Sequence, residues 1–423
     1  MLFYSTNGKS KPVDFKTALL RGLAEDGGLY MPNELGNFQF SISNFQFWKI
    51  LKNFIDIPEK DLEKICAEAF NFPVPLVRIS KDIHVLELFH GRTLSFKDFG
   101  ARFMARVMDY YMRIKNQELG IKEKLNIVVA TSGDTGSAVA NGFYGLSNIK
   151  VFVLYPSKRV SELQEKQMTT LGKNIVALEV QGDFDDCQRL AKQALADSNL
   201  RKEKNLSSAN SINIGRLLPQ MFYYFEGVKQ LGKQAVFVVP SGNFGNLTAG
   251  LFAKNLGLPI ERFIAAVNIN SAIPRFLESG KMEIRKTRLT LSNAMDVGSP
   301  SNWARIADLY EGNREKIQKD ISAVTISEEE THETIKKVYQ EFGYIADPHT
   351  AVGLAAAMKD TSRSPKIVLA TAHPAKFKET VEEAIGSKIS LPPALSKLRG
   401  KTKKSIVIGK NYSELYLQLT TNN

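Results

Sequence analysis

The stretch Ala235-Val-Phe-Val-Val-Pro240-Ser-Gly-Asn-Phe-Gly-Asn246 decides how this chain folds. Its apolar run predicts a buried strand, and the small residues of Ser241–Asn246 predict a turn that leads into a helix. Glycines let backbone N–H groups converge, and a helix N-terminus adds partial positive charge, so the loop suits one phosphate. The loop matches neither a dinucleotide fingerprint nor a Walker motif. On composition alone it also fits an ordinary tight turn.

The same alternation of short apolar strands with helices runs through most of the chain. Strands are predicted at 126–130, 151–155, 175–180, 263–267 and 367–370, and helices at 137–144, 161–172, 185–197, 349–359 and 377–385. Units of this length favour mainly parallel sheets covered by helices on both faces. The segments 15–23, 44–54 and 59–70 instead have apolar residues at helical spacing.

These patterns predict an α/β protein of two lobes preceded by a helical N-terminal region. We place the N-terminal region at residues 1–84. A smaller lobe at 85–205 carries Lys97 and the Ser132-Gly133-Asp134 segment, and a larger lobe at 206–423 carries the phosphate-sized loop.

Charge and cysteine content narrow the class of protein. The 423 residues include 56 lysines and arginines and 44 aspartates and glutamates, a net charge of +12. The basic residues are spread widely, no aromatic-basic interleaving typical of RNA binding is apparent, and the dense run Lys397–Lys404 is predicted to be solvated. Cys66 and Cys187 form no disulfide framework or metal spacing, which indicates a reducing compartment. With no signal peptide or apolar span, the sequence predicts a cytoplasmic protein without nucleic-acid or membrane partners.

The run His90-Gly-Arg-Thr-Leu-Ser-Phe-Lys97-Asp-Phe-Gly100 holds the most reactive candidate side chain. Bulky apolar neighbours disfavour the ammonium form of Lys97. A neutral amine attacks an aldehyde and forms a Schiff base. Pyridoxal phosphate carries both an aldehyde and a phosphate, so Lys97 and the loop Ser241–Asn246 together indicate pyridoxal chemistry.

Three further polar segments follow predicted strands or begin predicted helices. Thr131-Ser-Gly-Asp-Thr-Gly136 offers hydroxyls and N–H groups that suit the carboxylate of an amino acid, although it also fits an ordinary helix cap. Asn210-Ser-Ile-Asn213-Ile-Gly-Arg216 places an arginine fork beside a helix start. Thr371-Ala-His373 follows a strand at the end where α/β sheets bind ligands.

These motifs resemble the threonine synthase family of fold-type II pyridoxal-phosphate enzymes, in its bacterial and fungal branch. They stand in the family's order from about residue 4 to residue 376, as Tyr4-Ser-Thr-Asn-Gly8, Asp26-Gly-Gly-Leu-Tyr-Met-Pro32, the Lys97 run, Ala130-Thr-Ser-Gly-Asp-Thr-Gly136, Ser241-Gly-Asn-Phe-Gly-Asn246, Leu291-Ser-Asn-Ala-Met-Asp296, Pro300-Ser-Asn302, Asp347-Pro-His-Thr350 and Thr371-Ala-His-Pro-Ala-Lys376. One departure is visible. Arg92 stands where the family has proline, which removes a rigid φ and adds a charge near the active lysine.

The resemblance implies a role for each matching residue. Lys97 would carry pyridoxal 5'-phosphate as a Schiff base. The cofactor would also be bound by Asp134, Gly242, Asn243, Phe244, Gly245, Asn246 and Thr371, with the phosphate on the backbone of 242–246 and the pyridine nitrogen on the Thr371 hydroxyl. The substrate would be bound by Thr131, Ser132, Gly133 and Thr135 at its carboxylate and by Asn210, Ser211 and Arg216 at its phosphate.

The implied activity is that of a carbon–oxygen lyase that converts O-phospho-L-homoserine and water to L-threonine and phosphate. The enzyme would act as a monomer or homodimer. A phospholyase or dehydratase on the same scaffold, which releases 2-oxobutyrate, stays open as an alternative, as does a non-catalytic binding protein. Lys97 and both glycine loops argue against the latter.

Overall fold

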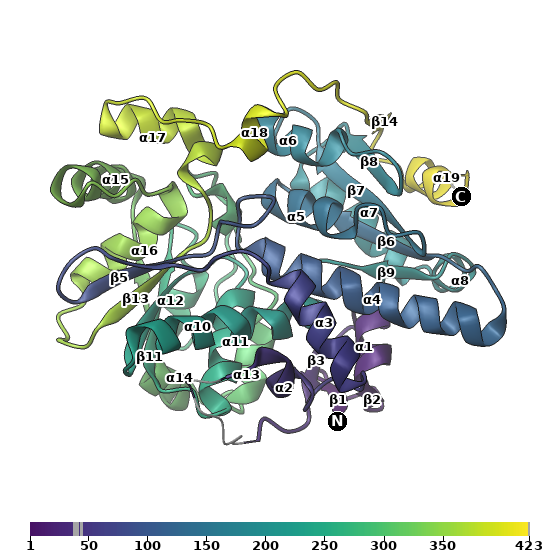
Figure 1. Cartoon of the computed structure of the whole chain (residues 1–423), viewed down its shortest axis with the longest axis horizontal. Coiled ribbons are helices and arrows are strands. Elements are labelled where there is room, and N and C mark those ends of the chain that lie inside the picture. Colours follow the sequence, from purple (N-terminus) through teal and green to yellow (C-terminus); the bar gives the residue numbers. More distant parts are fainter. Residues whose placement is uncertain (37–41, 43–44, 422–423) are drawn as a thin grey trace.

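The structure is a computed structural model that describes residues 1–36, 42 and 45–421. Its strands form a large sheet, a smaller sheet and a short N-terminal sheet (Figure 1). The large sheet has the order β12-β11-β10-β13-β5-β4, with strands at Ile321–Thr325, Ile260–Val267, Ala235–Pro240, Lys366–Ala370, Ile83–Glu87 and Leu76–Arg78. The smaller sheet has the order β14-β8-β7-β6-β9, with strands at Ile406–Ile408, Ile175–Val180, Ile149–Pro156, Leu125–Ala130 and Leu206–Ser208.

All strand pairs of these two sheets are parallel except β4 with β5. Helices fill the connections, as parallel pairing requires. They lie at α1 Phe15–Arg21, α2 Phe47–Leu51, α3 Glu59–Ala69, α4 Lys97–Leu119, α5 Asp134–Phe143, α6 Glu162–Thr169, α7 Phe184–Ala196, α8 Ser198–Glu203, α9 Ile214–Leu217, α10 Met221–Leu231, α11 Gly245–Asn255, α12 Ala272–Ser279, α13 Trp303–Leu309, α14 Arg314–Asp320, α15 Glu328–Phe342, α16 Pro348–Lys359, α17 Lys378–Ile385, α18 Pro393–Ser396 and α19 Tyr412–Thr421, with short 3₁₀ turns η1 Leu218–Gln220, η2 Asn293–Met295 and η3 Pro374–Phe377.

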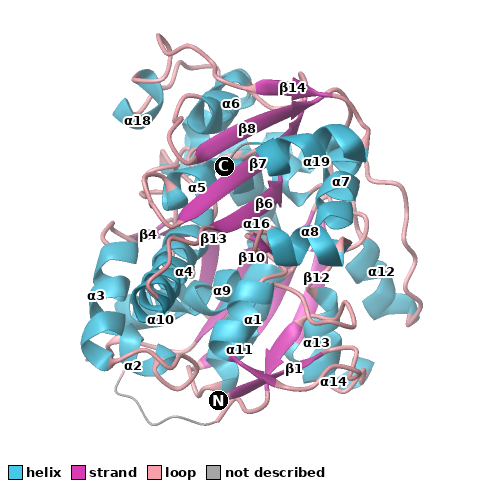
Figure 2. Cartoon of the chain, turned by 90° about the vertical axis from the view of Figure 1, so that its right-hand side faces the viewer, coloured by secondary structure: helices cyan, strands magenta, loops and turns pink. Residues whose placement is uncertain are grey.

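Alternate residues of each central strand face different helix layers. In the smaller sheet, Ile127 and Val129 belong to the core shared with α4 and α5, whereas Val128 and Ala130 pack with α7 and α19. The strands therefore read as continuous apolar runs because both faces are buried. This confirms the predicted α/β architecture of parallel sheets flanked by helices, and Figure 2 shows α5 and α7 on opposite sides of β7.

The N-terminal region is helical, as predicted, and carries in addition a small antiparallel sheet of order β2-β1-β3 at Val13–Asp14, Leu2–Ser5 and Tyr30–Pro32. These strands are so short that no run of alternating residues marks them in the sequence. The predicted start of the second helix at Asn44 lies outside the described residues, and α2 begins at Phe47.

Strand pairing differs from the proposed lobe boundaries at three places. The strand β5 crosses the boundary at 84/85 and pairs within the large sheet, together with β4. At the other boundary, β9 begins at Leu206 and pairs with β6 of the smaller sheet. The late strand β14 also joins the smaller sheet, beside β8. We therefore propose two lobes in which β5 belongs with the large sheet, and β9 and β14 belong with the smaller sheet. Boundaries taken from chain order alone cannot show which sheet a strand joins.

The basic run near the C-terminus is not wholly solvated, contrary to expectation. The Nζ atom of Lys403 lies 2.6 Å from Glu165 Oε1 and 2.5 Å from Glu179 Oε2. The backbone N–H of Lys404 donates to the carbonyl of Thr169, and β14 follows directly. Lys401 is exposed. The segment is held against the smaller lobe because β14 pairs there, which no local pattern indicates.

Among the described residues, we find no helix with both the length and the apolar character needed to cross a membrane.

The paired position of Lys403 predicts a measurable effect on stability. Lys403→Ala leaves two carboxylates without their shared cation, so we expect it to lower the free energy of unfolding by about 1 kcal/mol. Lys401→Ala, in the same run, is expected to change it by less than about 0.5 kcal/mol. Urea unfolding of both variants measures the difference, and equal effects would contradict the pairing.

Candidate active site

The predicted site segments lie at the carboxyl ends of parallel strands, two in each of the two larger sheets. The segment 131–136 follows β6, 210–216 follows β9, 241–246 follows β10 and 371–376 follows β13. In parallel sheets these ends lie at one edge, where ligands bind. The segment that leads to Lys97 follows β5 in the same large sheet. The fold therefore gathers segments that are far apart in the sequence.

Lys97 is the first residue of α4, and backbone contacts place it beside Thr371. The N–H of Phe96 donates to the carbonyl of Thr371 at 2.9 Å, and the N–H of His373 donates to that of Leu94 at 3.1 Å. Ser95 and Ala372 form an isolated antiparallel bridge between these bonds. Thr371 is 6% exposed. The lysine and the threonine thus share one rigid piece of backbone.

The surroundings of Lys97 favour its neutral form. Desolvation lowers the pKa of Lys97 to about 8, and the positive charges of Lys376 and Arg216 act in the same direction, whereas Asp134 opposes them. About a tenth of the amine is therefore neutral at pH 7, and this neutral form is the one that attacks an aldehyde.

Asp134 is the first residue of α5 and lies in a buried ionic contact. Its Oδ1 atom is 2.5 Å from Nζ of Lys376 and accepts a hydrogen bond from Nε2 of Gln164 at 2.8 Å. Burial acts to raise the pKa of Asp134, but Lys376 and then Lys97 outweigh it, so the pKa lies below its usual range. Asp134 therefore carries a fixed negative charge that acts on the amines of both Lys376 and Lys97.

The loop 241–246 leaves space only for backbone at its first glycine. A Cβ on Gly242 would lie 2.6 Å from Cα of Met295, so any side chain there would collide with backbone. Phe244 has φ of 60°, a left-handed conformation that turns the chain into α11, and its ring packs edge-on against Trp303. The N–H groups at the start of α11 are thereby presented at the helix N-terminus.

Two buried donors in the predicted phosphate-binding segments have no hydrogen-bond partner within the described part of the chain. The Oδ1 atom of Asn246 accepts from the hydroxyls of Tyr223 and Tyr224, while its Nδ2 is unpaired. Arg216 is 2% exposed and donates through Nη1 to the carbonyl of Ala209, while its Nε is unpaired. Buried donors without acceptors are costly. The residues therefore fit ligands with anionic oxygens, as pyridoxal phosphate and a phosphorylated substrate have.

The segments 210–216 and 241–246 are joined to each other. Nδ2 of Asn243 donates to the hydroxyl of Ser211 at 2.6 Å, and its Oδ1 accepts from the N–H of Ser301 at the same distance. Asn210 donates through Nδ2 to the carbonyl of Ala130, at the end of β6. The predicted cofactor loop and the predicted substrate-phosphate segment are thus neighbours.

The segment 131–135 is ordered by its own hydrogen bonds. The Thr131 hydroxyl accepts from the N–H groups of Gly133 and Gly136 and donates to the carbonyl of Gly133. This hydroxyl therefore shapes the loop, and Ser132 and Thr135 are the partly exposed hydroxyls beside it. Gly133 has φ of 154°, and a Cβ there would lie 2.9 Å from the Gln164 amide.

Sequence reasoning assigned no role to Lys376 and Gln164, which hold Asp134. The only signal for Lys376 was its place in the Thr371–Lys376 motif. Its Nζ also donates to the carbonyl of Thr93, so this lysine connects β13's end to both the Lys97 segment and α5. Within the described residues no group of histidine, cysteine and acidic side chains suits a metal ion.

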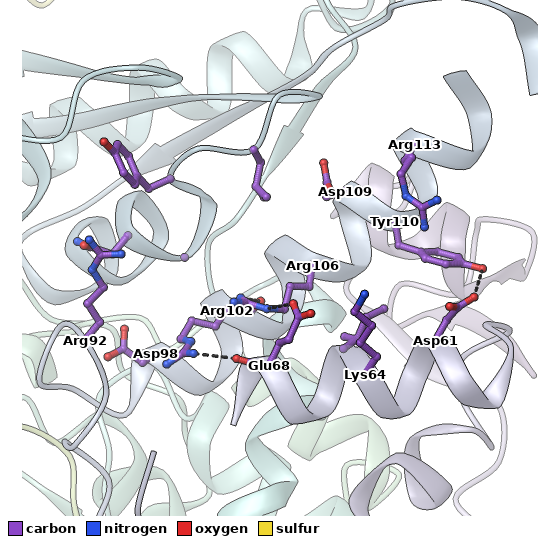
Figure 3. Close-up of a pocket in the computed structure, with 15 residues that line it drawn as sticks. Asp61, Lys64, Glu68, Arg92, Asp98, Arg102, Arg106, Asp109, Tyr110 and Arg113 are labelled. Atoms are coloured by element: carbon purple, nitrogen blue, oxygen red, sulfur yellow. Dashed lines mark hydrogen bonds and ion pairs between the residues drawn. The ribbon is translucent and has the colours of Figure 1, made fainter. Parts of the chain in front are cut away.

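Arg92 is exposed, and its side chain lines an outer groove. The guanidinium of Arg92 lies 5.9 Å from the centre of the Tyr144 ring. Desolvation lowers the pKa of Arg102, and the positive charge of Arg92 contributes to this shift. Arg92 lines a groove of about 410 Å³ along α3 and α4, with Arg102, Arg106 and Arg113 (Figure 3). Neither Lys97 nor the two glycine loops line this groove. The missing proline therefore adds charge to an outer surface.

Comparison with known proteins agrees with this geometry. The chain matches the pyridoxal-phosphate dependent enzyme family over residues 70–371, the threonine synthase N terminus over 2–70 and the threonine synthase C-terminal region over 350–416. It is 45% identical over 414 residues to threonine synthase of Serratia marcescens, covering 94% of each chain.

Solved structures give the same result. The crystal structure of Escherichia coli threonine synthase matches with a TM-score of 0.90 at 42% identity and covers all of both chains. The structure of pyridoxal-phosphate-bound threonine synthase from Brucella melitensis matches with a TM-score of 0.92 at 36% identity, covering 99% of this chain and 98% of that one. The chain therefore belongs to the threonine synthase family of pyridoxal-phosphate-dependent enzymes.

Proposed function

We propose that this chain converts O-phospho-L-homoserine and water to L-threonine and phosphate, with Lys97 as the residue that carries the cofactor. The observation that supports this most strongly is the combination of Lys97, whose pKa is lowered to about 8, with two buried N–H donors that lack acceptors, in segments joined by the hydrogen bond from Asn243 to Ser211. An amine and two anion-binding places are what this substrate and cofactor need.

Pyridoxal phosphate supplies an electron sink for the amino-acid carbons when it is bound. Lys97 then has two tasks: it attaches the cofactor, and its freed amine moves protons at Cα and Cβ of the substrate. Desolvation, helped by the charge of Lys376 and opposed by that of Asp134, lowers the pKa of this amine to about 8. The uncharged Thr371 hydroxyl would face the pyridine nitrogen of the cofactor. Because a hydroxyl would leave that nitrogen largely unprotonated, the cofactor would be an electron sink of moderate strength.

The two ends of the substrate would be held by different segments. The N–H groups at the start of α5 and the hydroxyls of Ser132 and Thr135 would bind the carboxylate. Arg216, Ser211 and Asn210 would bind the phosphate that leaves from Cγ, where Nε of Arg216 has no other acceptor among the described residues. The backbone of 242–246 would bind the cofactor phosphate.

We also propose that the enzyme works in the cytoplasm, as a monomer or homodimer and without nucleic acid. Its two cysteines, Cys66 and Cys187, are both unpaired and buried, which supports a reducing compartment.

Incubation with O-phospho-L-homoserine tests the reaction directly. We expect the purified protein to be yellow and to release threonine and phosphate in equal amounts. Lys97→Ala should lose the colour and reduce turnover by about a thousandfold or more, because both tasks depend on one amine. Release of 2-oxobutyrate in place of threonine would instead show a phospholyase.

The lowered pKa of Lys97 predicts how cofactor attachment depends on pH. Below about 8 the amine is protonated and cannot attack, so attachment to the apoprotein should accelerate as pH rises through about 8 and then level off. Lys376→Met removes a nearby cation and should move the midpoint upward. Rapid-mixing absorbance measurements give the profile. A midpoint near 10.5, the ordinary value for lysine, would contradict the proposed environment.

Replacement of Arg216 tests substrate-phosphate recognition. A buried guanidinium that is hydrogen-bonded to a phosphate contributes about 2–5 kcal/mol to the binding free energy, whereas an exposed charge contributes about 0–1 kcal/mol. Arg216→Ala should therefore reduce kcat/KM by orders of magnitude and weaken inhibition by inorganic phosphate, while cofactor loading is retained. Lys401→Ala is the exposed control, since Lys403 is paired. Equal, small effects of both changes would place the substrate phosphate elsewhere.

A further inference from the structure

Arg305 of α13 is a fully buried cation that lies behind the site. It is 0% exposed and donates only to neutral oxygens: the carbonyl of Tyr30 at 3.1 Å, Oδ1 of Asn302 at 2.5 Å and the carbonyl of Ile212 at 2.7 Å. Among the described residues no carboxylate forms an ion pair with it. Each of its three nitrogens thus has one neutral acceptor, and its charge has no ion-pair partner there.

An uncompensated buried charge is unfavourable. Removal from water penalises the guanidinium, and desolvation lowers the pKa of Arg305 to about 9. The three hydrogen bonds require the fork of an arginine, since an amide has only two N–H donors, but they supply no counter-charge for the guanidinium. The charge itself therefore points to an anion that this region binds.

The contacts of Arg305 lead directly to the loop 241–246. Asn302, which accepts from Arg305, has its Nδ2 3.2 Å from where a Cβ on Gly245 would lie. The backbone N–H of Asn302 donates to the carbonyl of Asn243. The backbone N–H of Ser301 donates to the side-chain Oδ1 of Asn243. The start of α13 is thus packed against the turn that begins α11. The Ile212 carbonyl adjoins Ser211, which also contacts Asn243.

We propose that Arg305 is a positioning residue for the cofactor phosphate: its buried charge is the counter-charge of that phosphate and acts through Asn302 on the loop 241–246. The proposal rests on the proposed place of the cofactor phosphate at this loop. Arg305 does not touch the phosphate. It holds Asn302 against the turn and keeps this part of the protein positive, which favours a dianion over a neutral ligand.

A comparison of two aldehydes isolates the phosphate. Pyridoxal phosphate and pyridoxal form the same bond with Lys97, and only the first carries the anion. We therefore measure the dissociation constants of both from the apoprotein by absorbance and form their ratio. Arg305→Met should reduce the preference for pyridoxal phosphate by about tenfold or more, with pyridoxal affinity changed by less than about threefold. Arg305→Lys keeps the charge and should retain most of the preference.

Arg262→Met is the matched control, because Arg262 pairs with Asp360 away from the loop and its removal should leave the ratio unchanged. If Arg305→Met lowers both affinities by the same factor, or neither, the residue has only a structural role and the proposal is wrong. Should that variant fail to fold, Asn302→Asp places a carboxylate on Arg305 in nearly the same shape. Its preference should also fall about tenfold or more, and an unchanged ratio overturns the proposal.

Gly242→Val, measured in parallel, separates this inference from the proposed site. A side chain there collides with Met295, so it should abolish the preference if the loop binds the phosphate. Loss in Gly242→Val without loss in Arg305→Met rejects the role of Arg305 alone. No loss in Gly242→Val rejects the place of the phosphate itself.

Discussion

Two backbone hydrogen bonds, from Phe96 to Thr371 and from His373 to Leu94, hold the segment before α4 against the segment after β13. They determine where Lys97 stands, because α4 begins directly after them. The Thr93 carbonyl adds to this junction by accepting from Lys376 and from Gln167 of α6. The reactive amine is therefore placed by strand ends and a helix of the smaller lobe together. Its protonation depends on charges that the same junction brings near, above all Asp134 and Lys376.

Much of the fold follows from local pattern. The strands at 175–180 and 235–240 have the predicted bounds, and Ser161 caps α6 through a bond from the Gln164 N–H, as its position at the predicted helix start indicated. Such elements are specified by residues a few positions apart. The exchange of β5, β9 and β14 between the proposed lobes is not, since which sheet a strand joins depends on its distant partners.

The candidate site shows the same division. Motifs identified the segments of the loops, and the structure places those segments at the carboxyl ends of strands in two sheets. Their supporting residues carry no local signal: Lys376 and Gln164 act on Asp134, and Arg305 acts through Asn302. Each is an ordinary polar residue in its own stretch of sequence. Lys376 and Gln164 contact Asp134 of another element, and Arg305 also contacts Tyr30 and Ile212, which are distant in the chain. Arg92 shows the converse, because a change beside an active lysine in sequence turns out to face another surface.

The strand order has a consequence for synthesis of the chain on the ribosome. In the large sheet β13 lies between β10 and β5, and the smaller sheet ends with β14, so each sheet is completed by a strand that is synthesised well after its neighbours. Until then β5, β10 and β8 expose apolar strand edges that have no neighbour. A nascent chain of this length with open edges is prone to aggregation. The strand order that builds the site therefore leaves these edges open until β13 and β14 have been synthesised.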